Sequence, residues 1–196
     1  MTQTFFDLIF GRPLDDRPCG ECIACCVVPV IDTPELKKPA GVVCPNCTGH
    51  SCAIHAHRPT VCREYNCGWK RIASLPVETR PDRSGLMITV ETHLPPRNLF
   101  EHLFIVAVLT KDPLDLETPL ARDMIDMLSR NVLPVFVFWN MTRHLVHPAP
   151  DLADAITNPD RQTDRALVRQ GRAWLERYAP FARAGAGEHT NLPYGL

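Results

Sequence analysis

Clustered cysteines are the feature that most constrains this chain. All nine lie between residues 19 and 67 of the 196, and the rest of the chain contains none. The densest stretch is CGECIACC, residues 19–26. Where thiols are kept reduced, such clusters more often indicate metal or redox chemistry than a disulfide framework. The sequence therefore predicts a sulfur-rich first third and a conventional remainder.

The spacing within CGECIACC is typical of metal ligation. Cys19, Cys22 and Cys25 form two overlapping Cys-x-x-Cys steps, and such a step lets two sulfurs approach one tetrahedral zinc at about 2.3 Å. The same spacing opens the bacterial ferredoxin run, but here Cys26 follows Cys25 directly. Because adjacent side chains tend to point apart, we expect Cys25 and Cys26 to serve two metals, or one metal and one structural role. Further ligands would come from downstream.

Two alternatives compete with metal ligation. Buried free cysteines can act as small hydrophobes, and disulfides require an oxidising compartment. The start MTQTFFDLIFGRP has no basic region, and Asp7 interrupts its apolar run, so we expect no signal peptide. No stretch reaches the roughly 18 consecutive apolar residues of a membrane span. We expect a cytoplasmic protein whose cysteines bind metal.

Charge and motifs narrow the possible functions. The chain has 21 basic and 22 acidic residues and a formal net charge of −1, which gives no electrostatic basis for binding nucleic acid or an anionic membrane. We expect neither as a partner, and the sequence identifies no protein or small-molecule partner. It also contains no Gly-x-Ser-x-Gly motif, phosphate-binding loop or dinucleotide fingerprint. No catalytic residue can therefore be named.

Three segments resemble the YkgJ family of cysteine-cluster proteins, whose members are described as zinc- or iron-chelating domains. The segments are CGECIACC, KPAGVVC at residues 38–44 and CAIHAHRPTVCREYNC at residues 52–67, so the resemblance covers roughly residues 19–70. It implies that eight cysteines bind metal: Cys19, Cys22, Cys25, Cys26, Cys44, Cys52, Cys62 and Cys67. Cys47 is additional to this pattern, and whether it is a ligand stays open.

Histidines could also contribute ligands. His55 and His57 follow Cys52 by three and five residues, close enough to join a mixed Cys/His zinc site. Relatives in the family carry aromatic or apolar residues near these positions. We therefore expect packing or hydrogen-bonding roles, and we keep His55 as an alternative ligand.

Eight thiolates divide naturally into two sets of four. Two Zn²⁺ ions bound to them would change the formal net charge from −1 to about −5, so nearby cations should offset the sites. The candidates are Arg58, Arg63, Lys70 and Arg71. Soft thiolates suit zinc, iron and iron–sulfur clusters, and spacing alone does not choose among them.

Two functional classes remain. Closed four-thiolate sites leave no open coordination position for catalysis, which favours a structural or metal-handling module. The alternative is an iron–sulfur enzyme, with protein or small-molecule methyl transfer suggested by the related cysteine cluster of flagellin lysine N-methylases.

The pattern predicts an α+β fold. We expect an irregular, metal-stabilised cysteine-rich region (19–70) joined to a small mixed α/β body (71–180) in one compact domain, with an N-terminal segment (1–18) and a flexible tail (181–196). In the body we expect a strand over 84–92, helix or strand over 99–110, and a helix from Thr118 to near Asn131. The body is completed by a strand over 132–139, which has 143–147 as its hairpin partner, and by a helix from Gln162 to Tyr178.

Overall fold

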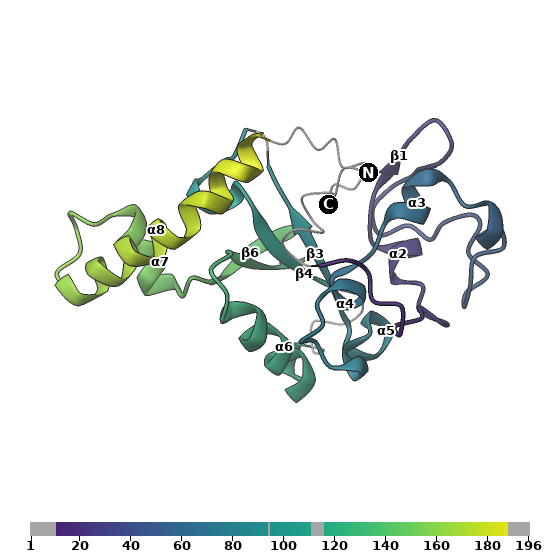
Figure 1. Ribbon diagram of the computed structural model, residues 1–196, viewed down its shortest axis with the longest axis horizontal. Coiled ribbons are helices and arrows are strands. Elements are labelled where there is room, and N and C mark those ends of the chain that lie inside the picture. The colour runs from purple at the N-terminus through teal and green to yellow at the C-terminus, as the bar shows by residue number, and fades with distance from the viewer. Residues whose placement is uncertain (1–10, 94, 111–115, 188–196) are drawn as a thin grey trace. The chain divides into compact units, whose positions relative to one another are not determined.

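The computed structural model describes residues 11–93, 95–110 and 116–187 and has a mixed α/β architecture (Figure 1). The chain divides into two compact units. Unit 1 contains the described parts of Met1–Ile88 and Val108–Ala121, and unit 2 those of Thr89–Ala107 and Arg122–His189. A four-stranded sheet has the order β3-β4-β5-β6, and a two-stranded sheet joins β1 to β2. This architecture is compatible with the predicted α+β class.

Short elements make up the cysteine-rich part of unit 1. Its helices are four or five residues long, because closely spaced prolines and glycines interrupt the chain. β1 (Ile31–Asp32) and β2 (Lys37–Lys38) pair antiparallel. The other elements of the unit up to its first long strand are α2 (Ala24–Val27), η1 (His55–His57), α3 (Thr60–Glu64), α4 (Gly68–Arg71), η2 (Val77–Thr79) and α5 (Pro81–Ser84).

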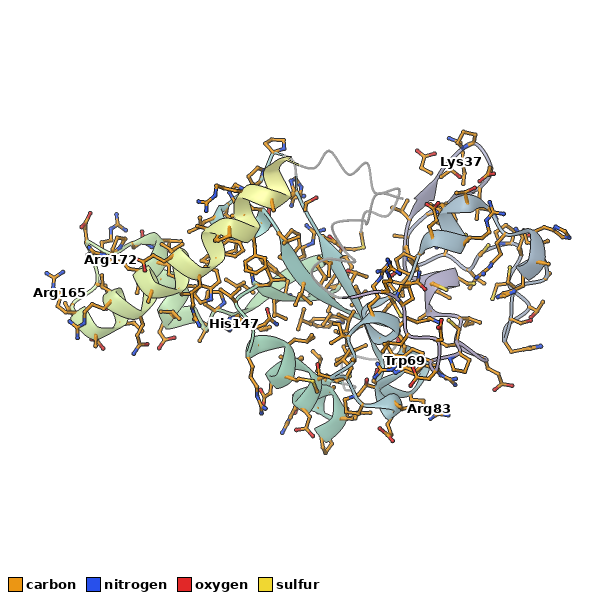
Figure 2. All side chains as sticks on the ribbon, viewed as in Figure 1. Lys37, Trp69, Arg83, His147, Arg165 and Arg172 are labelled. Atoms are coloured by element: carbon orange, nitrogen blue, oxygen red, sulfur yellow. The ribbon has the colours of Figure 1, made fainter. Side chains whose placement is uncertain are left out.

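A buried arginine stabilises the loop that follows the last cysteine. Arg17 is 5% exposed, and its guanidinium lies 5.5 Å from the centre of the Trp69 ring, which Figure 2 labels. It donates four hydrogen bonds to backbone carbonyls, those of Trp69 (2.6 Å), Ile72 (3.1 Å), Ala73 (3.1 Å) and Leu75 (2.6 Å). A buried charge must be compensated by hydrogen bonds, so the four carbonyls that accept from Arg17 are held in one arrangement. Nothing in the sequence pattern indicates this role.

Gly68 allows α4 to approach strand β3 (Leu86–Glu91). A Cβ atom at residue 68 would lie 2.6 Å from Cγ2 and 2.7 Å from Cβ of Ile88, and Ile88 is itself 1% exposed. Only glycine fits this approach. Cys67, which directly precedes Gly68, is thereby held beside the sheet.

The remaining long elements confirm several of the predictions. The strand expected over 84–92 is β3, and the segment 99–110 forms η3 (Leu99–Glu101) followed by β4 (Phe104–Leu109). The predicted helix start is also present, since the Thr118 hydroxyl accepts the Ala121 N–H (3.2 Å) at the beginning of α6 (Pro119–Ser129). Among the described residues, no helix is both long and apolar enough to cross a membrane.

A tight hairpin in unit 2 also matches its prediction. β5 (Val135–Trp139) and β6 (Thr142–His147) pair antiparallel, with Trp139 opposite Thr142. The two residues between them, Asn140 and Met141, have φ angles of 48° and 59°. Positive φ at both central positions gives a turn whose twist matches that of the flanking strands.

Helix α8 (Arg165–Gly187) closes the core of unit 2 and lies against α7 (Pro150–Thr157) (Figure 1). Tyr178 is 1% exposed, and its hydroxyl donates to the Leu103 carbonyl (3.1 Å) and accepts the Leu103 N–H (3.2 Å). The helix continues past its predicted end at Tyr178 and includes Pro180. The start of the expected tail is therefore helical, while residues 188–196 lie outside the described residues.

We predict that Gly68→Ala lowers the melting temperature by several degrees. The added methyl group must displace the packed Ile88 side chain, and overpacking of this kind typically costs about 1–3 kcal/mol. For a chain of this size, about 2–4 °C of melting temperature corresponds to each kcal/mol. The comparison is Gly171→Ala in α8, where the new Cβ would lie 3.0 Å from an Ile156 side-chain atom and alanine gains helix propensity. Equal melting temperatures for both variants and the wild type would contradict this explanation.

We also predict a pH-dependent contribution from His147 (Figure 2). Burial lowers the pKa of His147, and its Nε2 atom is buried with no hydrogen-bond partner among the described residues. In the unfolded chain the imidazole has its usual pKa of about 6.5, so near and below that pH the unfolded state binds a proton more readily than the folded state. The contribution of His147 to stability is therefore lost as the pH falls through and below that value. His147→Phe keeps an aromatic ring beside Trp174 but cannot be charged. As the pH is lowered from 7.5 to 5.5, the melting temperature of the variant should rise relative to that of the wild type. A difference that stays constant over this range would disprove the assignment.

Candidate metal centre

Four cysteines of unit 1 line one small cavity of about 20 Å³. This first cysteine set comprises Cys19, Cys22, Cys25 and Cys67. Cys19 and Cys22 precede α2, Cys25 lies within it, and Cys67 directly precedes α4. The negative charges of Cys19 and Cys22 contribute to raising the pKa of Cys67, as expected for thiols that are close together.

Four other cysteines form a second group. This second cysteine set comprises Cys26, Cys44, Cys52 and Cys62, all of which line a pocket of about 500 Å³. The Cys44 N–H donates to the Cys26 carbonyl (2.9 Å), which connects α2 to the following loop. Burial raises the pKa of Cys62, and the charges of the other three raise it further. Cys19, Cys22 and Cys25 of the first set also line this pocket, so the two sets adjoin, and the second set is distinguished by the mutual influence of its charges.

The two sets meet at the adjacent residues Cys25 and Cys26. These belong to different sets, but their side chains do not point apart, because their thiols form a hydrogen bond. This bond holds the proton on Cys25, which raises the pKa of Cys25 and lowers that of Cys26 to about 6. The sulfurs of the two sets are therefore close neighbours.

Cys47 and His55 lie near the second set. Cys47 forms an isolated β-bridge with Cys52, donates its N–H to the Cys44 carbonyl (2.9 Å), and hydrogen-bonds to the Cys26 thiol. The exposed His55 lines the 500 Å³ pocket together with the second set. His57 lines a different, neighbouring pocket.

A buried lysine provides positive charge at the second set. Lys38 is 2% exposed, and its ammonium donates to the carbonyls of Val27 (2.8 Å), Pro39 (3.0 Å) and Val42 (3.0 Å). Burial lowers its pKa, while the nearby charges of Cys44 and Cys26 oppose that effect. Nothing in the sequence marks Lys38 as buried, although it opens the segment KPAGVVC on which the family resemblance partly rests.

An arginine plays the corresponding part at the first set. Arg80 forms a bidentate ion pair with Asp82, at 2.6 and 2.8 Å. This pair raises the pKa of Arg80, and the charges of Cys22 and Cys19 contribute in the same direction. Gly20 makes room for the guanidinium, because a Cβ atom there would lie 2.8 Å from Arg80 Nη1. Each cysteine set thus has a cation held in place by other groups.

The cations expected from sequence have different surroundings. Arg58 is close enough to the second set that its charge adds to the lowering of the pKa of Cys26 and partly opposes the rise in that of Cys62. Arg58, Arg63 and Lys70 all line the 500 Å³ pocket. Arg71 has a structural role, since its guanidinium donates to the carbonyls of Asn66 (3.3 Å) and Gly11 (3.1 Å).

Backbone dipoles also favour thiolate at two positions of the first set. Burial raises the pKa of Cys22, and the N–H groups of Ala24 and Asp82 oppose this rise. Burial likewise raises the pKa of Cys67 to about 11, opposed by the N–H groups of Lys70 and Trp69. N–H groups directed at sulfur stabilise its charged form.

The sets are groups of neighbours rather than finished coordination shells. All nine cysteines are free thiols. Within the described ranges, no three side chains of Cys, His, Asp or Glu already have the geometry of ligands to one ion. The donor atoms are nonetheless chemically suited to a soft metal, and their side chains would have to rotate to bring four sulfurs to one ion.

Comparisons with known proteins provide no independent assignment. No family model matches the chain, and no curated protein or solved structure matches it with significant similarity.

Proposed function

We propose that this chain is a metal-binding protein in which each cysteine set holds one zinc or iron ion through four thiolates. The observation that carries the proposal is the gathering of eight cysteines around two cavities. Cys19, Cys22, Cys25 and Cys67 line the smaller cavity, and the charges of Cys26, Cys44 and Cys52 act together on Cys62 at the larger one. Four thiolates are the usual ligand number of a closed structural zinc site. The resemblance of residues 19–70 to the YkgJ family supports the same conclusion.

Charge compensation is a second argument. A Zn²⁺ ion with four thiolates carries a formal charge of about −2, which is costly to bury without partners. Lys38 at the second set and Arg80 at the first are both held by hydrogen bonds to other groups, so neither has to be ordered when metal binds. Buried or fixed cations of this kind reduce the cost of gathering thiolates.

Metal binding also accounts for the irregular backbone of unit 1. Helices of four or five residues are far below the roughly 12–15 residues at which an isolated helix becomes marginally stable. Structural zinc contributes apparent binding free energies of about 10–16 kcal/mol in small zinc-finger peptides. We propose that metal supplies comparable stabilisation here and that the protein acts as a structural or metal-handling module.

The deciding experiment is elemental analysis with an absorption spectrum, on protein purified anaerobically from cells grown without added metal. Two zinc ions per chain and a colourless solution are expected for two closed sites. Iron with acid-labile sulfide and visible absorption would instead assign a cluster. A fully reduced protein that contains neither metal and takes up none would refute the proposal.

Replacing Cys22 should remove about one of the two metal ions, because a tetrahedral site loses a ligand. We expect Cys22→Ser to reduce the metal content accordingly and to lower the melting temperature. Cys47→Ser is the matched comparison, since Cys47 lies beside the second set but outside the eight. The metal content of both variants is measured by mass spectrometry. A loss of metal as large in Cys47→Ser as in Cys22→Ser would make Cys47 a ligand. Full metal content in Cys22→Ser would contradict the ligand assignment.

Lys38→Met should destabilise the protein and weaken metal retention at the second set. The substitution leaves three carbonyls without their donor, at a typical cost of about 1–3 kcal/mol for a buried unsatisfied group, and removes the nearby positive charge. Its control is Lys37→Met at the neighbouring position, because the Lys37 side chain is 77% exposed and forms an ion pair with the exposed Asp32. Thermal melting and competition with a chelator measure the two effects. Identical behaviour of Lys38→Met and Lys37→Met would exclude a role for the buried ammonium.

A further inference from the structure

The pocket beside the second cysteine set is much larger than a metal ion requires. Its volume is about 500 Å³, comparable with the volume that about seventeen water molecules occupy in the liquid at about 30 Å³ each. The sulfurs already belong to its walls, so bound metal ions would fill only a small part of it. The volume lies within the range of about 300–1,000 Å³ typical of small-molecule sites.

The lining of this pocket combines apolar side chains with cations. Ile23, Ile31, Leu36 and Ile54 contribute apolar surface, and Arg58, Arg63 and Lys70 contribute positive charge. Among the described residues that line it, none is Asp or Glu. A small apolar cavity with a few directed polar groups is the usual form of a site that binds an organic molecule.

These cations retain unused hydrogen-bond donors. Within the described part of the chain, Arg58 uses only Nε, to the His55 carbonyl (3.1 Å), and Arg63 uses only Nη2, to the Thr60 hydroxyl (2.9 Å). Lys70 Nζ forms no hydrogen bond or ion pair with described residues, in contrast to the fully bonded Lys38. Guanidinium and ammonium groups with free donors are suited to carboxylate or phosphate oxygens.

Glu35, an acidic residue that could otherwise pair with these cations, already accepts a hydrogen bond from another group. Glu35 lines a neighbouring pocket together with Arg58 and Arg63. Its carboxylate accepts the Thr60 N–H (3.1 Å), and it forms no ion pair with either arginine in the described structure. The donors of the larger pocket are therefore free for a ligand.

We propose that this pocket binds a small organic anion, a carboxylate or phosphate group on an apolar body. Arg63 and Lys70, with Arg58, bind the oxyanion, and the isoleucines contact the apolar part. This site goes beyond metal binding and does not depend on it, since none of the three cations is a proposed ligand.

Calorimetric titration of the whole 196-residue chain tests the proposal with four probes: benzoate, phenyl phosphate, inorganic phosphate and benzamide, the neutral analogue of benzoate. Saturable binding of benzoate or phenyl phosphate is expected, at least tenfold tighter than benzamide, and the preferred probe identifies the oxyanion. Inorganic phosphate should bind more weakly than phenyl phosphate because it lacks the apolar body. Equal binding of benzamide and benzoate, or no binding of either organic anion, would overturn the proposal.

Variants provide an independent test. The double variant Arg63→Met, Lys70→Met should weaken binding of the preferred anion at least tenfold. Lys37 is a cation outside the pocket, so Lys37→Met should keep the affinity for that anion within about twofold of the wild type. Metal content and thermal melting of every sample show whether the protein is folded and loaded. Anion binding by reduced protein that contains no metal and takes up none would refute the metal proposal alone, and metal-loaded protein that binds no anion would refute the pocket alone.

Discussion

The gathering of eight thiols around the short helix α2 is the constraint on which the rest of unit 1 depends. Thiolates brought together repel one another, and burial raises the pKa values of Cys22, Cys62 and Cys67. Fixed positive charges offset the repulsion between the thiolates, with Lys38 at one set and Arg80 at the other. A soft cation bound to each set would remove the remaining repulsion, since it requires its sulfur ligands to be deprotonated.

Other parts of unit 1 hold the cysteines of the two sets in position. Arg17 fixes the loop that follows Trp69 through four carbonyls, and Gly68 brings that segment against Ile88 of β3. Cys67 therefore depends on contacts made far from the CGECIACC stretch. This arrangement gives a single distant cysteine a defined position beside three that are close in sequence.

The proposed anion pocket and the proposed metal sites share a wall. Cys26 and Cys62 of the second set line the same pocket as Arg63 and Lys70, so a bound anion would lie close to the sulfur ligands. A metal-handling role and an organic ligand are chemically compatible, because carboxylate and phosphate groups can approach a thiolate site through the adjacent cations.

The sequence by itself determined much of the regular structure, and it predicted a metal-binding chemistry that stays a proposal. Cysteine spacing predicted soft-metal ligands, and local signals such as Thr118 before Pro119 and the β-rich run 132–139 led to α6 and to strand β5. Tertiary structure alone decided which distant cysteines lie together, because neighbours such as Cys25 and Cys67 are far apart along the chain. It also decided the importance of Lys38 and Arg17: a lysine or arginine looks the same in sequence whether it faces solvent or lies buried among carbonyls, and only packing determines which.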